Sequence, residues 1–171
     1  MSTMKILMFG QTGQVATEVQ RQSDVIALGR DVANLCNVDA LRAAIRHHQP
    51  DVVINAAAYT AVDRAEEEEA LALAVNGVAP GVMAQECAAQ DIPFLHVSTD
   101  YVFDGSGTEP WAASDSVDPQ NAYGRTKLAG EVAVRAAGGN HAILRTSWVF
   151  SAHGANFVKT MLRLGETRDA L

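Results

Sequence analysis

The sequence predicts an α/β protein whose helices pack on a Rossmann-like, doubly wound parallel sheet. Three observations carry this prediction. Short apolar runs alternate along the chain with longer segments of helical periodicity, a pattern typical of βαβ units. The first run, residues 5–9, ends in a glycine-rich turn at Gly10, and a helical segment follows it. The 171 residues suffice for a domain with a substantial core.

Five apolar runs are expected to be the strands of this sheet. Continuous apolar runs without alternation are typical of parallel strands that are buried on both faces. Right-handed crossovers, with the glycine-rich turn after the first strand, predict the strand order 3-2-1-4-5. The expected strands cover residues 5–9, 25–28, 52–54, 93–97 and 141–144.

Helices are expected between and after the strands. In the Ala- and Glu-rich stretch 65–90, Gly77 and Pro80 should break or restart the helix. The acidic run Glu66–Glu69 is interpreted as a solvated helix start. Residues 101–121 form the longest irregular stretch, and a loop of that length is usually functional or mobile. The expected helices cover residues 14–23, 38–48, 65–90, 123–137 and 157–164.

The composition excludes several classes of protein. With 48% hydrophobic and 19% charged residues, the chain is neither disordered nor a coiled coil. No apolar run reaches the roughly 18 residues of a membrane span, and no signal sequence precedes the fold, so we expect a cytoplasmic location and no membrane partner. A net charge of −7 argues against a nucleic-acid partner. Cys36 and Cys87 lack metal or disulfide spacing and are expected to be reduced thiols.

The glycine-rich turn has the pattern of a dinucleotide fingerprint. It reads Gly10-Gln-Thr-Gly-Gln-Val-Ala16 and lies between an expected strand and an expected helix. Gly10 permits a tight turn, Gly13 lets backbone N–H groups approach a pyrophosphate, and Ala16 keeps the helix close to the sheet. The positive end of the helix then favours the phosphates. The alternative interpretation is an ordinary strand-to-helix turn.

The end of the second strand bears on the type of cofactor. A typical NAD site has an acidic residue there that holds the ribose hydroxyls, but this chain reads Ala27-Leu-Gly-Arg30. Arg30 could instead pair with a 2′-phosphate, which favours NADPH. The alternative is a solvated arginine. Because Asp31 follows directly, NADH stays an option.

Small and polar residues follow the third strand. In Asn55-Ala-Ala-Ala58 the small side chains leave room for the ribose on the nicotinamide side, with Tyr59 and Thr60 at the adjoining edge. The alternative is that the alanines simply pack well. Asn76, in the helical stretch 65–90, could face the sheet and hold backbone groups, or could be exposed.

A tyrosine and a lysine are placed for proton transfer. Tyr123 and Lys127 are four residues apart, so they share one face of the expected helix. The charge of Lys127 would favour the phenolate and lower the pKa of Tyr123 towards neutrality. A hydroxyl at the end of the fourth strand could donate to a substrate carbonyl. Ser98 and Thr99 are both candidates, but strand alternation lets only one face the site.

Five motifs together resemble the extended short-chain dehydrogenase/reductases. Within this family, the chain is most similar to the reductases of 4-keto deoxysugars attached to a nucleotide. The similarity covers essentially all 171 residues and implies NADPH-dependent reduction of a sugar C4 ketone. The alternatives are a non-catalytic or regulatory NAD(P)-binding subunit of the family, or another nucleotide-sugar reductase or epimerase. The motifs are Gly10–Val15, Asn55–Asp63, Ser98–Asp104, Tyr123–Glu131 and Arg145–Val149.

The resemblance also implies roles for single residues. Thr99 would polarise the substrate carbonyl, Tyr123 would donate the proton and Lys127 would tune it. Thr99, Asp100 and Trp148 would contact the substrate. The residues expected to line the cofactor are Gly10, Thr12, Gly13, Gln14, Val15, Arg30, Asn34, Leu35, Ala56, Ala57, Ala58, Tyr59, Thr60, Tyr123 and Lys127.

The chain departs from this family in a few places. Asn34 stands where members usually have an aspartate near the adenine, which implies a weaker anchor. Glu18 matches a glutamate associated with Mg²⁺ at a dimer interface, but a single exposed glutamate is the preferred interpretation, so no metal is expected. A homodimer is compatible with the resemblance. Members continue into a smaller C-terminal domain, so residues 1–150 are expected to be the NAD(P)-binding domain and residues 151–171 the start of the substrate-binding region.

Overall fold

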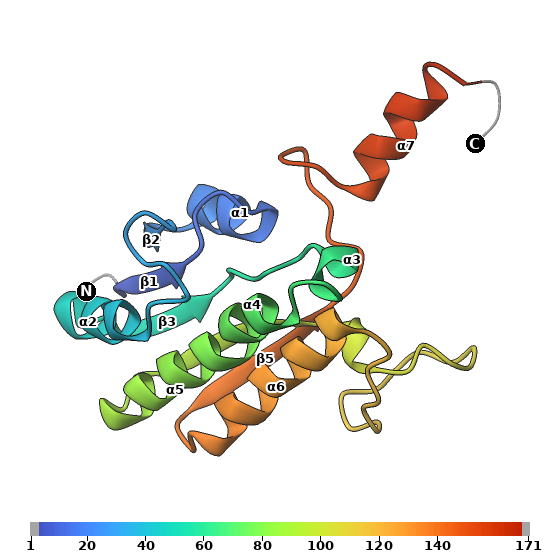
Figure 1. The fold of residues 1–171 in the computed structure, drawn as a ribbon. Coiled ribbons are helices and arrows are strands. Elements are labelled where there is room, and N and C mark those ends of the chain that lie inside the picture. The colour runs from blue at the N-terminus through green and yellow to red at the C-terminus, as the bar shows by residue number, and fades with distance from the viewer. Residues whose placement is uncertain (1–3, 169–171) are drawn as a thin grey trace.

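The computed structural model describes residues 4–168 and contains a five-stranded, fully parallel sheet (Figure 1). Every expected strand is present, and its bounds differ from the expected ones by at most two residues at either end. The short apolar runs are therefore sufficient to place the strands. These are β1 (Ile6–Phe9), β2 (Val25–Leu28), β3 (Val52–Asn55), β4 (Phe94–Thr99) and β5 (His141–Thr146).

The strands lie in the order β2-β1-β3-β4-β5, so the expected order 3-2-1-4-5 is wrong. In the expected order β3 would pair with the free edge of β2, but the turns of residues 29–37 and the helix after them carry the chain back across β1. The third strand consequently crosses back and pairs with the other edge of β1. The sheet is still doubly wound, and the direction of the crossovers reverses between β1 and β3.

The helices follow the expected ranges with one exception. The stretch 65–90 is neither one regular helix nor broken at Gly77: three short helical segments lead into a longer one. A π-helical segment, η1, lies where Gly77 was expected to interrupt the helix, and Pro80 lies in the first turn of the helix that follows. The helical elements are α1 (Gln14–Gln22), α2 (Val38–His48), α3 (Val62–Ala65), α4 (Glu69–Leu73), η1 (Ala74–Val78), α5 (Ala79–Ala89), the 3₁₀ turn η2 (Asp100–Val102), α6 (Ala122–Ala136) and α7 (Phe157–Gly165).

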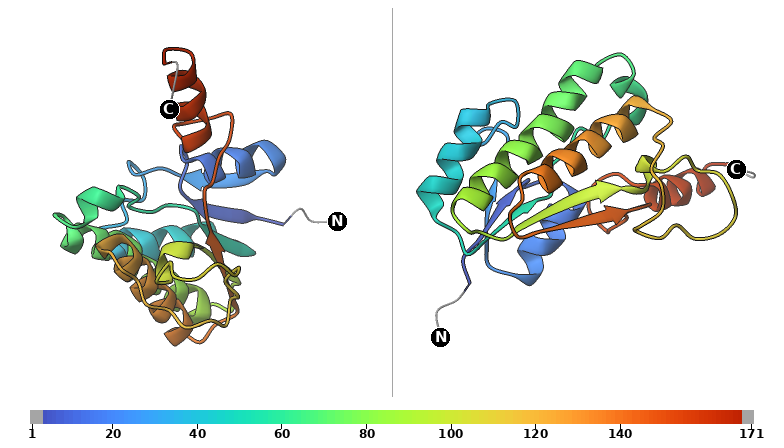
Figure 2. Two further views of the ribbon diagram at one scale, coloured as in Figure 1. Left: turned by 90° about the vertical axis from the view of Figure 1, so that its right-hand side faces the viewer. Right: turned by 90° about the horizontal axis from the view of Figure 1, so that it is seen from below.

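The two faces of the sheet are covered unequally. Helices α2, α5 and α6 lie side by side on one face, whereas α1 lies on the other (Figures 1 and 2). Within residues 4–168, Ala142 and Leu144 of β5 are exposed on the thinly covered face. The main core fills the space under the three-helix layer and includes Leu7, Phe9, Leu41, Ile45, Val53, Met83, Phe94 and Val134.

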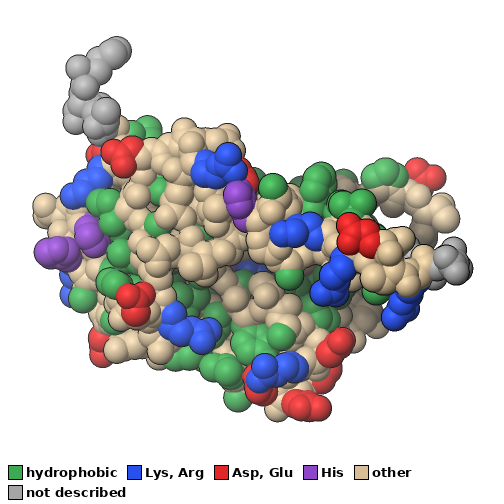
Figure 3. Space-filling model, turned by 90° about the horizontal axis from the view of Figure 1, so that it is seen from above, with side chains coloured by type: hydrophobic (Ala, Val, Ile, Leu, Met, Phe, Trp, Pro, Cys, Tyr) green, Lys and Arg blue, Asp and Glu red, His purple; other side chains and the backbone are tan. Residues whose placement is uncertain are grey.

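The last described element stands away from this body. α7 has no buried residue, and it projects beyond the sheet (Figure 2). Phe157, Val158 and Leu162 are exposed on it, and Figure 3 shows hydrophobic side chains among charged ones on this projection. Of the helices in the described part of the chain, none is long and apolar enough to cross a membrane.

Candidate active site

Two adjoining cavities lie at the carboxyl ends of the parallel strands. The first, of about 730 Å³, reaches over the ends of β1 and β2. The second, of about 310 Å³, reaches over the ends of β4 and β5. Gly13 and residues 56–58 line both, so the two cavities form one elongated site across the point where the crossovers reverse. Ligands of doubly wound sheets bind at this place.

The turn after β1 is built for close backbone approach. Gly10 has a φ of +113°, and a Cβ added there would lie 3.1 Å from the carbonyl carbon of Ala56 and 3.2 Å from the backbone nitrogen of Ala57. Only glycine fits this position without strain. α1 then begins at Gln14, and Gly13 before it offers no side-chain cap, so the first N–H groups of the helix are free to bind an anion.

The first cavity holds the residues expected near the adenosine end of a dinucleotide. Arg30 is exposed and makes no hydrogen bond or ion pair with the described residues. Asn34 lines the cavity, but its side-chain oxygen accepts a hydrogen bond from the backbone N–H of Cys36 at 3.0 Å. Asn34 therefore also stabilises the turn after β2. Gly10, Thr12, Leu35 and Tyr59 line the same cavity.

Sequence reasoning missed a charged pair beside this cavity. The hydroxyl of Tyr59 donates to Glu68 at 2.5 Å, and Glu68 also pairs with Arg64 at 2.5 Å. These two hydrogen bonds lower the pKa of Glu68, the bond from Tyr59 contributing most. The acidic run is thus no mere solvated helix start, since Glu66 also accepts from the backbone N–H of Ala122 at 2.7 Å. The spacing of Arg64 and Glu68 by four residues was the available signal.

In the second cavity, the structure selects Thr99 over Ser98. The hydroxyl of Ser98 donates to the buried carboxylate of Glu131 at 2.7 Å, on the far side of β4. The Thr99 hydroxyl donates to Asp100 at 3.1 Å and also forms a hydrogen bond with Tyr123. Thr99, Tyr123 and Lys127 line the same cavity, as their expected roles require.

The expected effect of Lys127 on Tyr123 is wrong for this structure. The pKa of Tyr123 is raised, chiefly by burial and also by the nearby carboxylate of Asp100, and the hydrogen bond with Thr99 only partly opposes this. The Lys127 amine donates to the backbone carbonyl of Val97 at 2.7 Å, and its charge contributes nothing to the pKa shift of Tyr123. Burial lowers the pKa of Lys127 to about 8.

Asn76 fixes the chain segment between the two cavities. Its side-chain oxygen accepts from the N–H of Tyr59 at 2.8 Å, and its amide nitrogen donates to the Tyr59 carbonyl at 3.0 Å. The same nitrogen donates to the Thr126 hydroxyl at 3.2 Å. Asn76 is therefore buried and holds backbone groups, and it is not an exposed asparagine.

The residues expected to contact substrate lie at the open end of the second cavity. Asp100 accepts from the Ser147 hydroxyl at 2.5 Å, which joins the ends of β4 and β5. Trp148 follows with a φ of +51°, an uncommon conformation for a residue other than glycine. Its side chain is 74% exposed and contacts Phe157 edge to face, with ring centroids 4.9 Å apart. Val15 and Thr60 also line this cavity.

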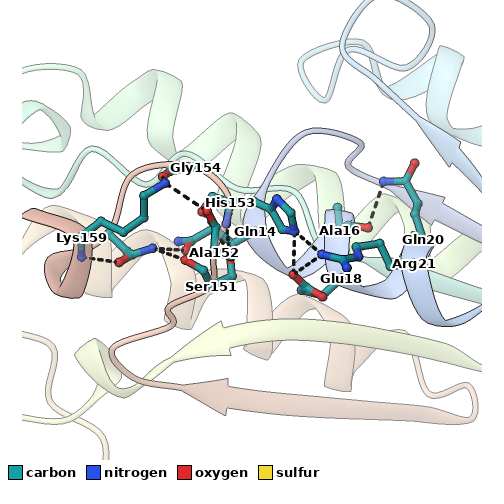
Figure 4. A network of polar contacts seen from close by, with 11 residues as sticks. Gln14, Ala16, Glu18, Gln20, Arg21, Ser151, Ala152, His153, Gly154 and Lys159 are labelled. Carbon is teal, nitrogen blue, oxygen red and sulfur yellow. Dashed lines mark hydrogen bonds and ion pairs between the residues drawn. The ribbon is translucent and has the colours of Figure 1, made fainter.

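Gln14 and Glu18 face the segment that leads to α7 (Figure 4). The Gln14 side chain accepts from Ser151 at 3.3 Å and from Asn156 at 2.9 Å, so its amide holds this segment. Glu18 lies 3.1 Å from His153 and 3.8 Å from Arg21. Across residues 4–168 no three His, Cys, Asp or Glu side chains gather to hold a metal ion, and magnesium at Glu18 has no support.

A glycine-rich turn, an elongated cavity at the switch point and a Thr-Tyr-Lys group at its far end define a Rossmann-like domain of the extended short-chain dehydrogenase/reductase class. Comparison with known proteins narrows this class. Residues 4–171 match the family described as the RmlD substrate binding domain, and the chain belongs to that family. The match runs through the expected regions 1–150 and 151–171 alike; of these, residues 1–3 and 169–171 lie outside the described part.

Similar proteins agree with this assignment. The chain is 47% identical to a dTDP-4-dehydrorhamnose reductase of Burkholderia thailandensis, covering 98% of this chain and 58% of the relative. It is 40% identical to the spore coat polysaccharide biosynthesis protein SpsK of Bacillus subtilis, of which it covers 61%. A dTDP-4-dehydrorhamnose reductase structure from Clostridium acetobutylicum superimposes with a TM-score of 0.92 at 42% identity, over 97% of this chain and 61% of that one.

A further structure bears on the cofactor. The dTDP-4-dehydrorhamnose reductase of Bacillus anthracis, solved in complex with NADP, matches with a TM-score of 0.93 at 31% identity. The match covers 98% of this chain and 61% of that one. The chain therefore spans about three fifths of the length of the relatives it matches.

Proposed function

We propose that this chain is the cofactor-binding and proton-donating part of an NADPH-dependent reductase. The enzyme would reduce the C4 ketone of dTDP-4-dehydro-L-rhamnose to give dTDP-L-rhamnose. One observation carries the proposal: Thr99, Tyr123 and Lys127 meet at one end of a cavity whose other end holds Arg30. The names of the relatives support the choice of substrate.

The cavity fits a phosphorylated dinucleotide. The close approach at Gly10 and the uncapped start of α1 suit the pyrophosphate. The guanidinium of Arg30, which has no partner within residues 4–168, suits a 2′-phosphate. The NADP complex of the Bacillus anthracis relative supports this choice, and NADH remains the competing cofactor. Residues 56–58 carry only methyl side chains, which leaves space between the two cavities.

The residues of the second cavity can assist the reduction of a ketone. When bound, the nicotinamide supplies the hydride. The raised pKa of Tyr123 keeps its phenol protonated at neutral pH, so it can give its proton to the developing alkoxide oxygen. The Thr99 hydroxyl can donate a hydrogen bond to the same oxygen, which stabilises its charge. Asp100 and Trp148 line the mouth of the cavity and would orient the sugar.

A second function has its own support. A non-catalytic NAD(P)-binding subunit needs the first cavity but no complete substrate site. Trp148 and α7 are largely exposed, so the substrate end of the cavity is incompletely walled in this chain. The cytoplasmic location and the homodimer stay predictions of the sequence.

Cofactor binding can be tested with a matched pair of glycine variants. A Cβ at Gly13 or at Gly165 meets no atom within 4 Å, so Gly13→Val and Gly165→Val should both fold. Gly13→Val should weaken NADPH binding by at least about tenfold, because its side chain would occupy space next to the first turn of α1. Gly165→Val, on the remote α7, should bind like the parent chain. Fluorescence titration with NADPH measures both, and equal affinities would contradict the proposed cofactor site.

The reaction can be tested in a chain extended to the length of its relatives. With dTDP-4-dehydrorhamnose as substrate, NADPH oxidation should be observed, and Tyr123→Phe should lower kcat by roughly 10²–10⁴-fold. NADPH affinity should change little, because only the hydroxyl is removed. A parent enzyme that binds NADPH without oxidising it would favour the non-catalytic subunit.

A further inference from the structure

Behind the candidate site, three buried polar side chains form a chain of contacts that the proposed reaction does not use. Asn55 ends β3, His96 lies in the middle of β4, and Lys127 lies on α6. All three are at most 1% exposed. The Asn55 amide nitrogen lies 3.1 Å from His96 Nδ1, and Lys127 Nζ lies 3.5 Å from His96 Nε2. These contacts join Lys127 to the end of β3, the strand directly before residues 56–58, which line both cavities.

The backbone of Ala57 fixes the direction of these hydrogen bonds. Its N–H can only donate, and it donates to the side-chain oxygen of Asn55 at 3.2 Å. The Asn55 NH₂ group must therefore face His96, where it donates to Nδ1. Since Nδ1 accepts, the single proton of a neutral imidazole must be on Nε2. His96 is neutral because burial, and then the nearby Lys127, lower its pKa to about 3.

This tautomer directs an N–H group at the Lys127 amine. An ammonium has donors and no lone pair, whereas a neutral amine can accept one hydrogen bond and still donate two. The contact between Nε2–H and Nζ is therefore favourable only to the neutral amine, whose own N–H donates to the Val97 carbonyl at 2.7 Å. A charged Lys127 would face a donor across 3.5 Å.

We propose that His96 is a positioning residue for Lys127: as the Nε2–H tautomer it holds the lysine amine and, through Asn55, ties it to the backbone of Ala57. Residues 56–58 line both cavities, so the chain of contacts connects the amine to the wall of the cofactor site. The proposal rests on the proposed function only in treating Lys127 as part of the active site.

Other titratable groups surround this amine. On α6 these are Glu131, one turn further on, and Tyr123 in the preceding turn. Asp100 approaches from the turn after β4 and lines the same cavity as Lys127. The carboxylate of Glu131 raises the pKa of Lys127, although burial outweighs it, and Arg145 pairs with that carboxylate at 2.7 Å. His96 is the residue among these whose N–H favours the neutral amine.

The tautomer can be read directly from the unmodified chain. Nitrogen NMR of histidine-labelled protein separates protonated from unprotonated ring nitrogens, and loss of a signal in His96→Asn assigns His96. The expected result is a protonated Nε2 and an unprotonated Nδ1 at pH 9, where Lys127, with a pKa of about 8, is mostly neutral. A protonated Nδ1 would overturn the proposal, and this measurement does not depend on the folding of any variant.

The effect on Lys127 can be measured with two variants that each keep half of the contacts. The chain has only three lysines, Lys5, Lys127 and Lys159, so lysine-labelled protein gives three signals to follow against pH. His96→Asn can still meet Asn55 but cannot reach Lys127, and the titration midpoint of Lys127 should rise by about one pH unit. His96→Gln can place its NH₂ group near the position of Nε2–H and should keep the midpoint of the parent chain.

An unchanged Lys127 midpoint in His96→Asn would overturn the proposal. These measurements need neither cofactor nor substrate, so they are independent of the proposed reaction. A chain that binds NADPH but carries its His96 proton on Nδ1 would leave the proposed function intact and remove the positioning role. A chain that fails to bind NADPH but has the Nε2–H tautomer would do the reverse.

Discussion

Among single residues, Arg30 differs from the other arginine at the first cavity because it has no partner among the described residues. Arg64 is already paired with Glu68. An unpaired guanidinium can give charge-assisted hydrogen bonds to a 2′-phosphate, each contributing roughly 1.5–3 kcal/mol. We therefore expect Arg30→Ala to weaken NADPH binding by about 10–100-fold and NADH binding hardly at all.

Titration of the chain with both cofactors measures this preference. Arg163→Ala, an exposed residue on α7 away from both cavities, serves as the control. An equal loss of affinity for NADPH and NADH in Arg30→Ala would contradict the 2′-phosphate assignment.

Glu131 makes the free energy of unfolding depend on pH in the acid range. Burial alone would raise its pKa, but hydrogen bonds from Arg145, Ser98 and Arg135 outweigh this and lower the pKa to about 2. The native state therefore holds the ionised form more tightly than the unfolded chain does. Its contribution is present above the ordinary carboxyl pKa of about 4.5 and is lost as the pH falls from there towards 2.

The matching variant is Glu131→Gln, which leaves two arginines without their buried partner. We expect it to lower the free energy of unfolding by about 3–5 kcal/mol at pH 7 and to flatten the acid limb of the stability curve. Urea unfolding at a series of pH values measures both effects. A variant whose stability falls as steeply as that of the parent between pH 4.5 and 2 would show that other carboxyl groups cause the acid loss.

For the candidate site, the sequence predicted which residues take part better than it predicted the hydrogen bonds that they make. The sequence narrowed the polarising hydroxyl to Ser98 or Thr99, but the choice depends on Glu131, which lies 33 residues from Ser98. The tuning of Tyr123 by Lys127 was inferred from a spacing of four residues, which sets the helix face but not where the amine donates. The carbonyl of Val97, on a neighbouring strand, decides that.

At the scale of elements, α6 packs so closely against η1 that there is no room for an added side-chain atom at Gly130. A Cβ at Gly130 would lie 2.1 Å from the carbonyl oxygen of Asn76, a backbone atom that cannot move aside alone. The side chain of Asn76 holds Tyr59 next to the cavities. A displaced η1 would therefore also displace Tyr59, which lines the first cavity.

Gly130→Ala tests this packing. We expect a loss of at least about 1–3 kcal/mol in the free energy of unfolding, since an added methyl group forces a backbone shift. NADPH affinity should fall as well. The control is Gly165→Ala, where the added methyl group meets nothing within 4 Å and stability should change by less than about 0.5 kcal/mol. Urea unfolding measures the stability of both variants. Equal free energies of unfolding for Gly130→Ala and Gly165→Ala would contradict the close contact at Gly130.

The strands and most helices could be predicted because their signals are local. Apolar runs and helical periodicity place each element within a few residues, and α2 has the expected bounds. The strand order could not be predicted in this way, because it depends on which strand the crossover from β2 reaches, and no local signal in the sequence specifies that. Here the crossover through residues 29–51 passes β1, and β3 pairs with the edge of β1 opposite to β2.

At the scale of the whole molecule, the cavity is more complete at its cofactor end than at its substrate end. Trp148 and α7 contribute large exposed apolar surfaces next to the second cavity. A reactant that is held loosely by about 1 Å can react 10²-fold more slowly. We expect this chain to bind NADPH with the affinity of a chain extended to the length of its relatives, but to reduce dTDP-4-dehydrorhamnose at least about 10²-fold more slowly. Parallel titrations and NADPH-oxidation assays compare the two, and equal kcat/KM values would contradict this expectation.

The order of the strands also bears on how the protein is made. Synthesis delivers β1 first, and β2 then pairs with one of its edges. β3, β4 and β5 are added one after another on the opposite side, each to a strand that has already left the ribosome. No strand has to wait for a partner encoded later in the chain. The nascent sheet can therefore grow outward from β1 during translation, with only one newly added edge exposed on the growing side at any time.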